Sequence, residues 1–148
     1  MRAVVQVVHR AEVTLASGEK LAEIGQGLCA FVAIHRTDTA AVAERLVDKV
    51  ANARLLPDDG KPWSLSLRDS GAELLVVSNF TLYGDLSKGR RPSWSLAMAP
   101  PDAEPLYQAV VDGLRGLDLK VSTGAYGAEM NVELVNWGPS TIVLDVEA

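Results

Sequence analysis

The side chains that usually perform acid–base or nucleophilic chemistry are few in this sequence and far apart. His9 and His35 are its two histidines, and neither has a carboxylate or hydroxyl at a spacing that would make a proton relay. Cys29 lies inside the apolar run Leu28–Val32, which is typical of a small buried core residue. No His, Cys, Asp or Glu residues have metal-ligand spacing, and the glycine-rich nucleotide loop and the G-x-S-x-G elbow are absent. The sequence therefore predicts neither a metal nor a cofactor.

The strongest chemical signal is a group of hydroxyl and amide groups at a strand end. Glu73–Ser78 is apolar on consecutive positions, which predicts a strand covered on both faces, and it leads into Asn79, Phe80 and Thr81. Hydroxyls and free backbone N–H groups at such a place can hold an oxyanion or a substrate carbonyl without a titratable side chain. Thr81 is a nucleophile only if a base activates it. The same residues are also compatible with a turn cap at the end of a strand.

The pair Gly138-Pro139 is a second unusual feature, between the strand-like runs Met130–Val135 and Thr141–Val146. Proline has no N–H for a sheet ladder, and glycine between apolar runs marks a sharp bend or a close backbone approach. The bond before a proline can also be cis. Spacing alone leaves two interpretations open, an ordinary hairpin turn and a stiff functional corner.

Charge and hydropathy limit the partners. The net charge is -5, which argues against a general nucleic-acid coat protein, because such a protein needs a broad basic face. The only dense basic cluster is Lys88-Gly89-Arg90-Arg91, which is either a solvated loop or a small patch for part of an RNA. No apolar run reaches the ~18–20 residues that span a membrane, and no signal peptide is recognisable. The sequence therefore predicts a cytoplasmic protein.

The elements that must position these residues are strands mixed with two helices. The length of 148 residues predicts one domain, residues 1–148, with an aliphatic core. Before the first helix the sequence predicts short strands at Arg2–His9, Glu12–Ala16, Leu21–Ile24 and Leu28–Ile34. One amphipathic helix follows the capping residues Thr37–Thr39 and ends near Ala53, and another starts near Pro101. Pro57–Pro62 is predicted to be a loop, and a long loop precedes the second helix. This pattern predicts a layered α/β domain.

Two of these stretches together resemble the D-aminoacyl-tRNA deacylase family. Ser78–Leu82 and the loop after it are similar to the family's S-Q-F-T-L motif and following loop. Asn136-x-Gly138-Pro139-x-Thr141 is similar to its N-x-G-P-x-T motif. The likeness runs the whole length of the chain, and the two motifs occur in the right order with matching flanks.

The resemblance implies a fold, an activity and an assembly. The implied fold is a single α/β domain with a mixed, mainly antiparallel sheet and two main helices. The implied protein is a cytoplasmic homodimer that hydrolyses the ester between tRNA and a D-amino acid or glycine, without a cofactor and without a membrane or DNA partner. In that family the Gly-Pro bond is cis and reaches into the partner subunit's pocket. Its carbonyl oxygens hold the substrate's α-amino group, and its backbone clashes with an L side chain.

The resemblance also implies roles for particular residues. Catalytic positions fall on Asn79, Phe80 and Thr81. Backbone N–H groups around Asn79 and Phe80 would polarise the ester carbonyl, and the 2′-OH of the terminal ribose would assist the attack. Substrate contacts fall on Ser78, Met130, Asn136, Gly138 and Pro139. Contacts with tRNA phosphates fall on Lys88, Arg90 and Arg91. Thr81 is expected to bind substrate and not to attack it, because no base stands near it in sequence.

The chain departs from the family pattern at four positions, which are Val7 and Ala125 in place of arginine, Asn79 in place of glutamine, and Ser140 in place of valine or phenylalanine. The missing arginine at position 7 is associated in the family with pinning the Gly-Pro corner. Two alternatives to this activity stay open. One is a non-catalytic or altered-specificity dimer that binds aminoacyl-tRNA or a related adenosine ligand. The other is an ordinary esterase that uses Thr81 or Cys29.

Overall fold

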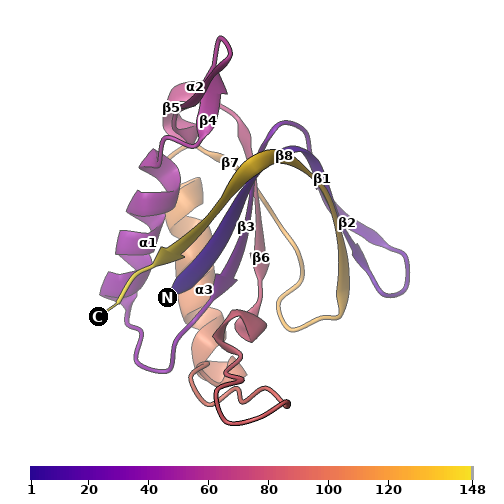
Figure 1. The fold of residues 1–148 in the computed structure, drawn as a ribbon, viewed down its shortest axis with the longest axis vertical. Helices are drawn as coiled ribbons and strands as arrows, with labels where there is room; N and C mark the ends of the chain where they lie inside the picture. Colours follow the sequence, from indigo (N-terminus) through magenta and orange to yellow (C-terminus); the bar gives the residue numbers. More distant parts are fainter. Residues whose placement is uncertain (148) are drawn as a thin grey trace.

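The computed structural model describes residues 1–147 as one mixed sheet with two long helices against one of its faces (Figure 1). In chain order the elements are β1 (Arg2–Leu15), β2 (Lys20–Ile24), β3 (Gly27–Ala33), α1 (Ala40–Asn52), β4 (Leu56–Asp58), β5 (Lys61–Leu65), α2 (Leu67–Ser70), β6 (Glu73–Ser78), the 3-10 turn η1 (Phe80–Tyr83), α3 (Pro100–Arg115), β7 (Lys120–Thr123) and β8 (Met130–Asp145). No helix within residues 1–147 is long and apolar enough to cross a membrane.

The sheet has an antiparallel half and a parallel half. The long strand β1 pairs antiparallel with β2, β3 and β8, whereas β3, β6 and β7 run parallel to one another. The predicted mixed, mainly antiparallel sheet with two main helices is therefore confirmed. The parallel strands β3 and β6 end at the same edge of the sheet, so the residues that follow them lie together at that edge.

The core forms on both faces of the sheet. On one face α1 packs with Val42, Leu46 and Val50, four residues apart, which is the predicted amphipathic stripe. On the other face a second cluster includes Cys29 and Leu75. The middle of β6 is buried on consecutive positions, so the prediction of a strand covered on both faces is confirmed.

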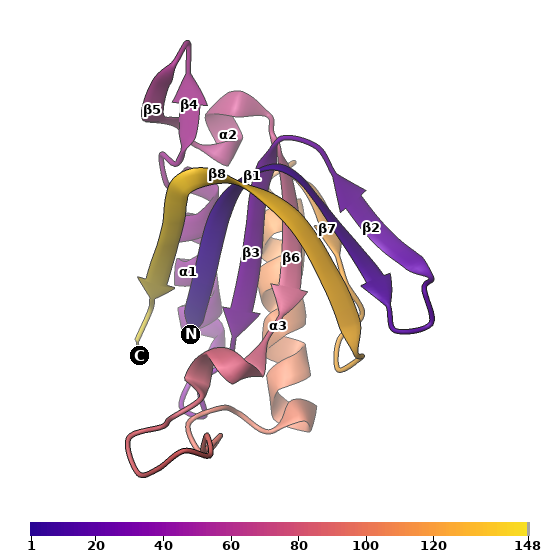
Figure 2. The same cartoon turned by 45° about the vertical axis from the view of Figure 1, so that its right-hand side comes forward.

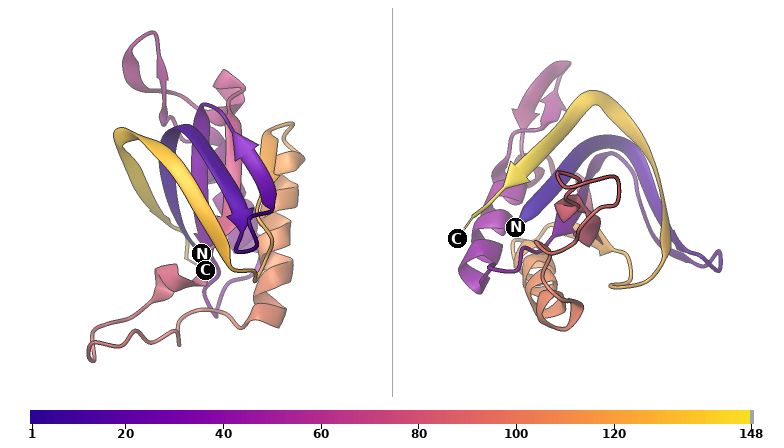
Figure 3. Two further views of the ribbon diagram at one scale, coloured as in Figure 1. Left: turned by 90° about the vertical axis from the view of Figure 1, so that its right-hand side faces the viewer. Right: turned by 60° about the horizontal axis from the view of Figure 1, so that its bottom comes forward.

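The chain ends meet beside α1. The N-terminal amine of Met1 donates to a carboxylate oxygen of Asp38 at 2.7 Å and to the carbonyl of Val146 at 2.6 Å. Both Met1 and Asp38 are almost fully buried there. Figure 3 shows the first and last strands side by side at this end of the sheet.

Two strand boundaries differ from the prediction. The runs Arg2–His9 and Glu12–Ala16 are not separate strands, because β1 continues through both. The runs on either side of Gly138-Pro139 are likewise one bent strand, β8, and both halves pair with β1. The hairpin interpretation of this corner is therefore wrong. The register shifts between Gln6 and Val8, so residues after Asn136 form an outward bulge and the ladder resumes at Thr141.

The segment predicted as a loop at Pro57–Pro62 is also different. It lies within the hairpin β4–β5, which stands beyond the helices close to α2, at the end of the molecule where β8 bends (Figure 2). Its turn lies at Asp59-Gly60, both at positive φ. Two prolines and two aspartates obscured the short strands, because all four favour turns. The one-turn helix α2 was not predicted, although Ser66 and Asp69 form a capping box.

Candidate active site

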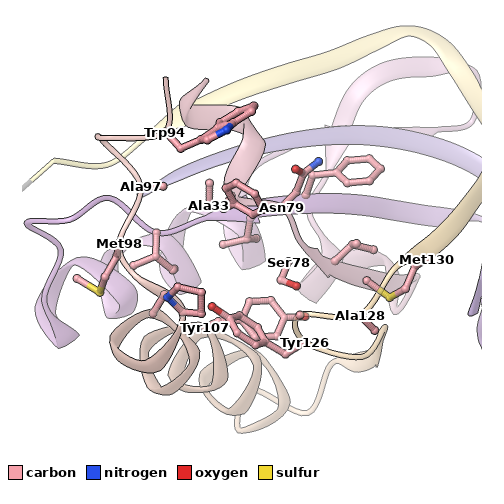
Figure 4. Close-up of a pocket in the computed structure, with 18 of the residues that line it drawn as sticks. Ala33, Ser78, Asn79, Trp94, Ala97, Met98, Tyr107, Tyr126, Ala128 and Met130 are labelled. Atoms are coloured by element: carbon pink, nitrogen blue, oxygen red, sulfur yellow. The ribbon is translucent and has the colours of Figure 1, made fainter. Parts of the chain in front are cut away.

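A cavity of about 630 Å³ lies at the edge of the sheet where β3 and β6 end. Its walls are the strand ends, the start of α3 with the loop before it, and the connection between β7 and β8 (Figure 4). The lining includes Ser78, Asn79, Phe80, Trp94, Tyr107, Tyr126 and Met130. Of the predicted site residues, the fold therefore brings the Ser78–Phe80 segment together with Met130, from far apart in the sequence.

The turn after β6 offers one free backbone donor. The N–H of Asn79 donates to the carbonyl of Val32 at 2.8 Å, which extends the pairing of β3 with β6. The N–H of Thr81 donates to Asn79 Oδ1 at 3.2 Å. The N–H of Phe80 has no hydrogen-bond partner within residues 1–147, and Phe80 lines the cavity. Of the two amides that the resemblance implies, only that of Phe80 has no hydrogen-bond partner within residues 1–147.

Asn79 and Thr81 are joined by two hydrogen bonds. The Asn79 side chain caps η1, and its Oδ1 accepts hydrogen bonds from both the N–H and the hydroxyl of Thr81. An amide oxygen is not a base, so it cannot take the hydroxyl proton and make Thr81 a nucleophile. The arrangement instead makes Asn79 the residue that orders the turn carrying the Phe80 amide.

Met130 is fixed at the cavity wall by the loop before β8. Its Sδ accepts a hydrogen bond from the N–H of Ala125 at 3.3 Å. A Cβ placed on Gly124 would stand 2.5 Å from this sulfur, so glycine is needed there for the observed packing. Ala125, one of the departures from the family pattern, therefore contributes through its backbone.

Aromatic residues that sequence reasoning did not select complete the cavity. The hydroxyl of Tyr107 donates to the carbonyl of Val76 at 3.1 Å, and burial raises the pKa of Tyr107 to about 12. Its ring contacts Tyr126, with centroids 5.4 Å apart. Trp94 meets the edge of Phe80, also at 5.4 Å. Ala103, Tyr107, Val110 and Leu114 recur at helical spacing on the buried side of α3, a signal that could have placed Tyr107 inward.

The Gly138-Pro139 corner lies apart from the cavity of its own chain. Asn136, Gly138 and Pro139 are not among the lining residues, and both Gly138 and Pro139 are exposed. Their peptide bond is cis. The two predicted halves of the site are therefore separate within one chain.

Side-chain hydrogen bonds tie this corner to β1. Asn136 Nδ2 donates to the carbonyl of Val7 at 2.9 Å and to the carbonyl of Ser140 at 3.1 Å. Gln6 Nε2 donates to Thr141 Oγ1 at 2.9 Å. The side chain of Val7, where the family pattern has arginine, is buried in the core, and only its carbonyl serves the corner. The Asn and Thr of the N-x-G-P-x-T motif thus both hold the bulge.

The basic cluster lies in the long loop between η1 and α3. A pair of backbone hydrogen bonds between Asp85 and Ser93 closes the base of this loop. Lys88, Arg90 and Arg91 are all exposed, and none forms an ion pair with another residue of the described chain. Along the chain, the loop leads to Trp94, which lines the cavity.

The remaining candidates for chemistry are not in the site. Cys29 is fully buried, and burial raises the pKa of its thiol to about 12, which makes it inert at neutral pH. His9 stacks on Trp137, with ring centroids 4.4 Å apart, and His35 bonds to Thr37. Within residues 1–147 no three His, Cys, Asp or Glu side chains are grouped so as to hold a metal. An esterase that uses Cys29 is therefore excluded.

Comparisons with known proteins agree along the whole chain. The family described as D-Tyr-tRNA(Tyr) deacylase matches residues 4–145. A protein named D-aminoacyl-tRNA deacylase from Kocuria rhizophila is 49% identical, with 98% of this chain and 93% of that protein covered. Another of that name, from Symbiobacterium thermophilum, is 46% identical, with 99% and 97% covered.

Two solved structures share the fold. A structure titled "c-Myc DNA Unwinding Element Binding Protein" has a TM-score of 0.92 and 41% identity and covers 100% of both chains. A structure titled as a probable eukaryotic D-amino acid tRNA deacylase has a TM-score of 0.83 over 98% of both chains, and at 17% identity this likeness concerns the fold alone. The family match, the close relatives and the cavity lead to one conclusion: the chain belongs to the D-aminoacyl-tRNA deacylase family of hydrolases.

Proposed function

We propose that this protein hydrolyses the ester bond of D-aminoacyl-tRNA and of glycyl-tRNA, releasing the free amino acid and tRNA. The observation that carries the proposal is the cavity at the end of β6, which is lined by hydroxyl and aromatic residues and by Phe80, whose N–H has no partner within residues 1–147. No base and no activated nucleophile accompany it in the described chain. Such a site suits a substrate that is reactive by itself, and an aminoacyl ester with a neighbouring ribose hydroxyl is of that kind.

In the proposed reaction the protein positions and polarises. The ester carbonyl oxygen accepts the hydrogen bond of the Phe80 N–H, which stabilises the negative charge that develops when water attacks the carbonyl carbon. The water oxygen forms the new C–O bond, the bond to the ribose oxygen breaks, and a water proton reaches that oxygen with help from the adjacent 2′-OH. Ser78 and Met130 line the space for the aminoacyl group and the terminal adenosine.

Selectivity is proposed to come from a second copy of the chain. In a homodimer, the Gly138-Pro139 corner of one subunit enters the cavity of the other, where its carbonyl oxygens bind the α-amino group. Two observations support this arrangement: the corner is exposed and outside its own cavity, and Asn136 and Gln6 hold it firmly. A backbone at this place excludes an L side chain, whereas glycine has no side chain to exclude. A tRNA substrate goes with a location in the cytoplasm.

The proposal is tested with D-Tyr-tRNA, L-Tyr-tRNA and Gly-tRNA under enzyme excess. We expect release of D-tyrosine and glycine and no release of L-tyrosine, with light scattering at twice the monomer mass of 15.8 kDa. An intact D ester would sink the proposal. If a non-hydrolysable aminoacyl-adenosine analogue still bound, that result would favour a non-catalytic binding protein.

Replacement of the Thr81 hydroxyl is expected to have a small effect. In Thr81→Val the shape is nearly kept and the N–H can still donate to Asn79, so single-turnover hydrolysis of D-Tyr-tRNA should fall by less than about tenfold, the worth of one hydrogen bond. A decrease of about 10³-fold or more with unchanged binding of the analogue would instead identify Thr81 as a nucleophile.

Charge reversal in the basic loop is expected to weaken tRNA binding through the phosphates. Arg90→Glu should raise KM. It should also make the negative slope of log(kcat/KM) against log[salt] shallower, by about 0.7–0.9 for each phosphate that the loop no longer binds. The matched control is Lys49→Glu, an equal change of charge on the exposed side of α1. An unchanged slope in Arg90→Glu, or an equal change in both variants, places the tRNA elsewhere.

A further inference from the structure

The Gly138-Pro139 corner has a contact from outside the β1–β8 pair. Trp63 Nε1 donates a hydrogen bond to Ser140 Oγ at 3.2 Å, although Trp63 belongs to β5 in the hairpin that precedes α2. Figures 1 and 2 show the β4–β5 hairpin and the bend of β8 at the same end of the molecule. The hairpin thus touches the residue that directly follows Pro139.

The conformation of Trp63 is not explained by burial. Its φ is 53°, in the left-handed region that a bulky side chain rarely adopts. Burial of the side chain does not offset this strain, because the residue is 54% exposed and lies outside the core. Backbone outliers of this kind persist where the surrounding structure requires them, and the Trp63 side chain donates a hydrogen bond to Ser140.

Ser140 is held from two sides. Its carbonyl accepts a hydrogen bond from Asn136 Nδ2 at 3.1 Å, and its hydroxyl accepts the one from Trp63. The valine or phenylalanine of the family pattern at this position has no acceptor in its side chain. On the other side of the corner, Trp137 stacks on His9. The serine therefore gives the corner an acceptor for a hydrogen bond from the β4–β5 hairpin.

We propose that Trp63 and Ser140 form a positioning pair that sets the place of the Gly138-Pro139 backbone and so the discrimination between D and L esters. This inference rests on the proposed function, in which the Gly138-Pro139 backbone of one subunit enters the cavity of the other and acts as a gate that excludes L side chains. The pair touches no reacting atom. It acts by limiting how far the corner can move when an L side chain presses against it.

The activity test compares Trp63→Phe, which keeps a ring but removes the N–H, with Ser140→Ala, which removes the acceptor. We expect the ratio of kcat/KM for L-Tyr-tRNA to that for D-Tyr-tRNA to rise by about threefold to tenfold in each variant, the range for removal of one hydrogen bond. In the double variant the ratio should rise no further, because both changes remove the same interaction. Lys61→Ala, an exposed position on the same strand, should leave the ratio unchanged.

A structural test separates failure of this inference from failure of the proposed function. The chain has three tryptophans, so the indole N–H signals in a ¹H–¹⁵N spectrum are few, and Trp63→Phe assigns the one of interest. Ser140→Ala should shift that signal if the hydrogen bond exists in solution. An unshifted signal, or a shifted signal with an unchanged L-to-D ratio, overturns the positioning role. If wild-type protein does not cleave D-Tyr-tRNA, the proposed function fails, and with it the selectivity role, while the signal still decides whether the hydrogen bond exists.

Discussion

Phe80→Pro is expected to slow hydrolysis of D-Tyr-tRNA by about 10²–10³-fold relative to Phe80→Ala, the usual cost of one oxyanion-hole donor. Both variants lose the aromatic ring at the rim of the cavity, but only proline also removes the backbone N–H. Because the N–H groups of Asn79 and Thr81 are already engaged, no neighbouring amide of the turn can replace it. Single-turnover rates at saturating enzyme measure the difference.

We expect proline at position 80 to leave the turn folded. Phe80 is the first residue of η1, a position that tolerates proline, and Asn79 before it is not helical, with φ -150° and ψ 85°. Equal melting temperatures and equal affinities for a non-hydrolysable analogue in the two variants would confirm that the fold is kept. Equal rates in the two variants would contradict the role of this amide.

Sequence patterns predict best the elements that are long and periodic. The stripe of α1 and the continuous apolar run of β6 each appear where they were expected, because burial of one face or of both dictates their residues. The prediction failed where turn-forming residues lie inside strands. Gly138-Pro139 in β8 and the prolines of β4–β5 interrupt the local pattern, but pairing with β1 or across the hairpin overrides it.

The features of the site likewise divide into those that motifs predict and those that depend on tertiary structure. The Ser78–Thr81 turn and Met130 were selected from motifs, and the cavity contains most of them. Which amide of the turn is free depends on the pairing of Asn79 with Val32, a tertiary fact that no local pattern carries. Trp63 was not selected at all, because its hydrogen bond to Ser140 joins positions 77 residues apart.

Gly138→Ala is expected to lower kcat/KM for D-Tyr-tRNA by about 10²-fold or more, because a displacement of about 1 Å in a reacting complex has effects of this size. Within its own chain the added methyl has room. Apart from its two chain neighbours, a Cβ on Gly138 would meet only Asn136 Oδ1 among residues 1–147, at 3.5 Å, an ordinary contact. In the proposed homodimer the effect is expected where the exposed corner of one subunit meets the substrate in the other subunit's cavity, because the added methyl would displace the substrate's α-amino group.

The variant separates a gate from a structural turn. If the corner only shapes the fold, Gly138→Ala should be as active as Gly116→Ala, a control at the exposed end of α3 where the backbone is right-handed helical. If the corner enters the partner's cavity, Gly138→Ala should keep the melting temperature and the dimer mass and lose activity on D-Tyr-tRNA.

A mixed dimer, in which one subunit carries Gly138→Ala and the other carries Phe80→Pro, gives a sharper test. Because each cavity would combine its own Phe80 with the partner's Gly138, one of the two cavities would contain both changes and the other neither. Such a dimer should retain about half of the wild-type activity, whereas a corner that serves its own subunit would leave both cavities defective.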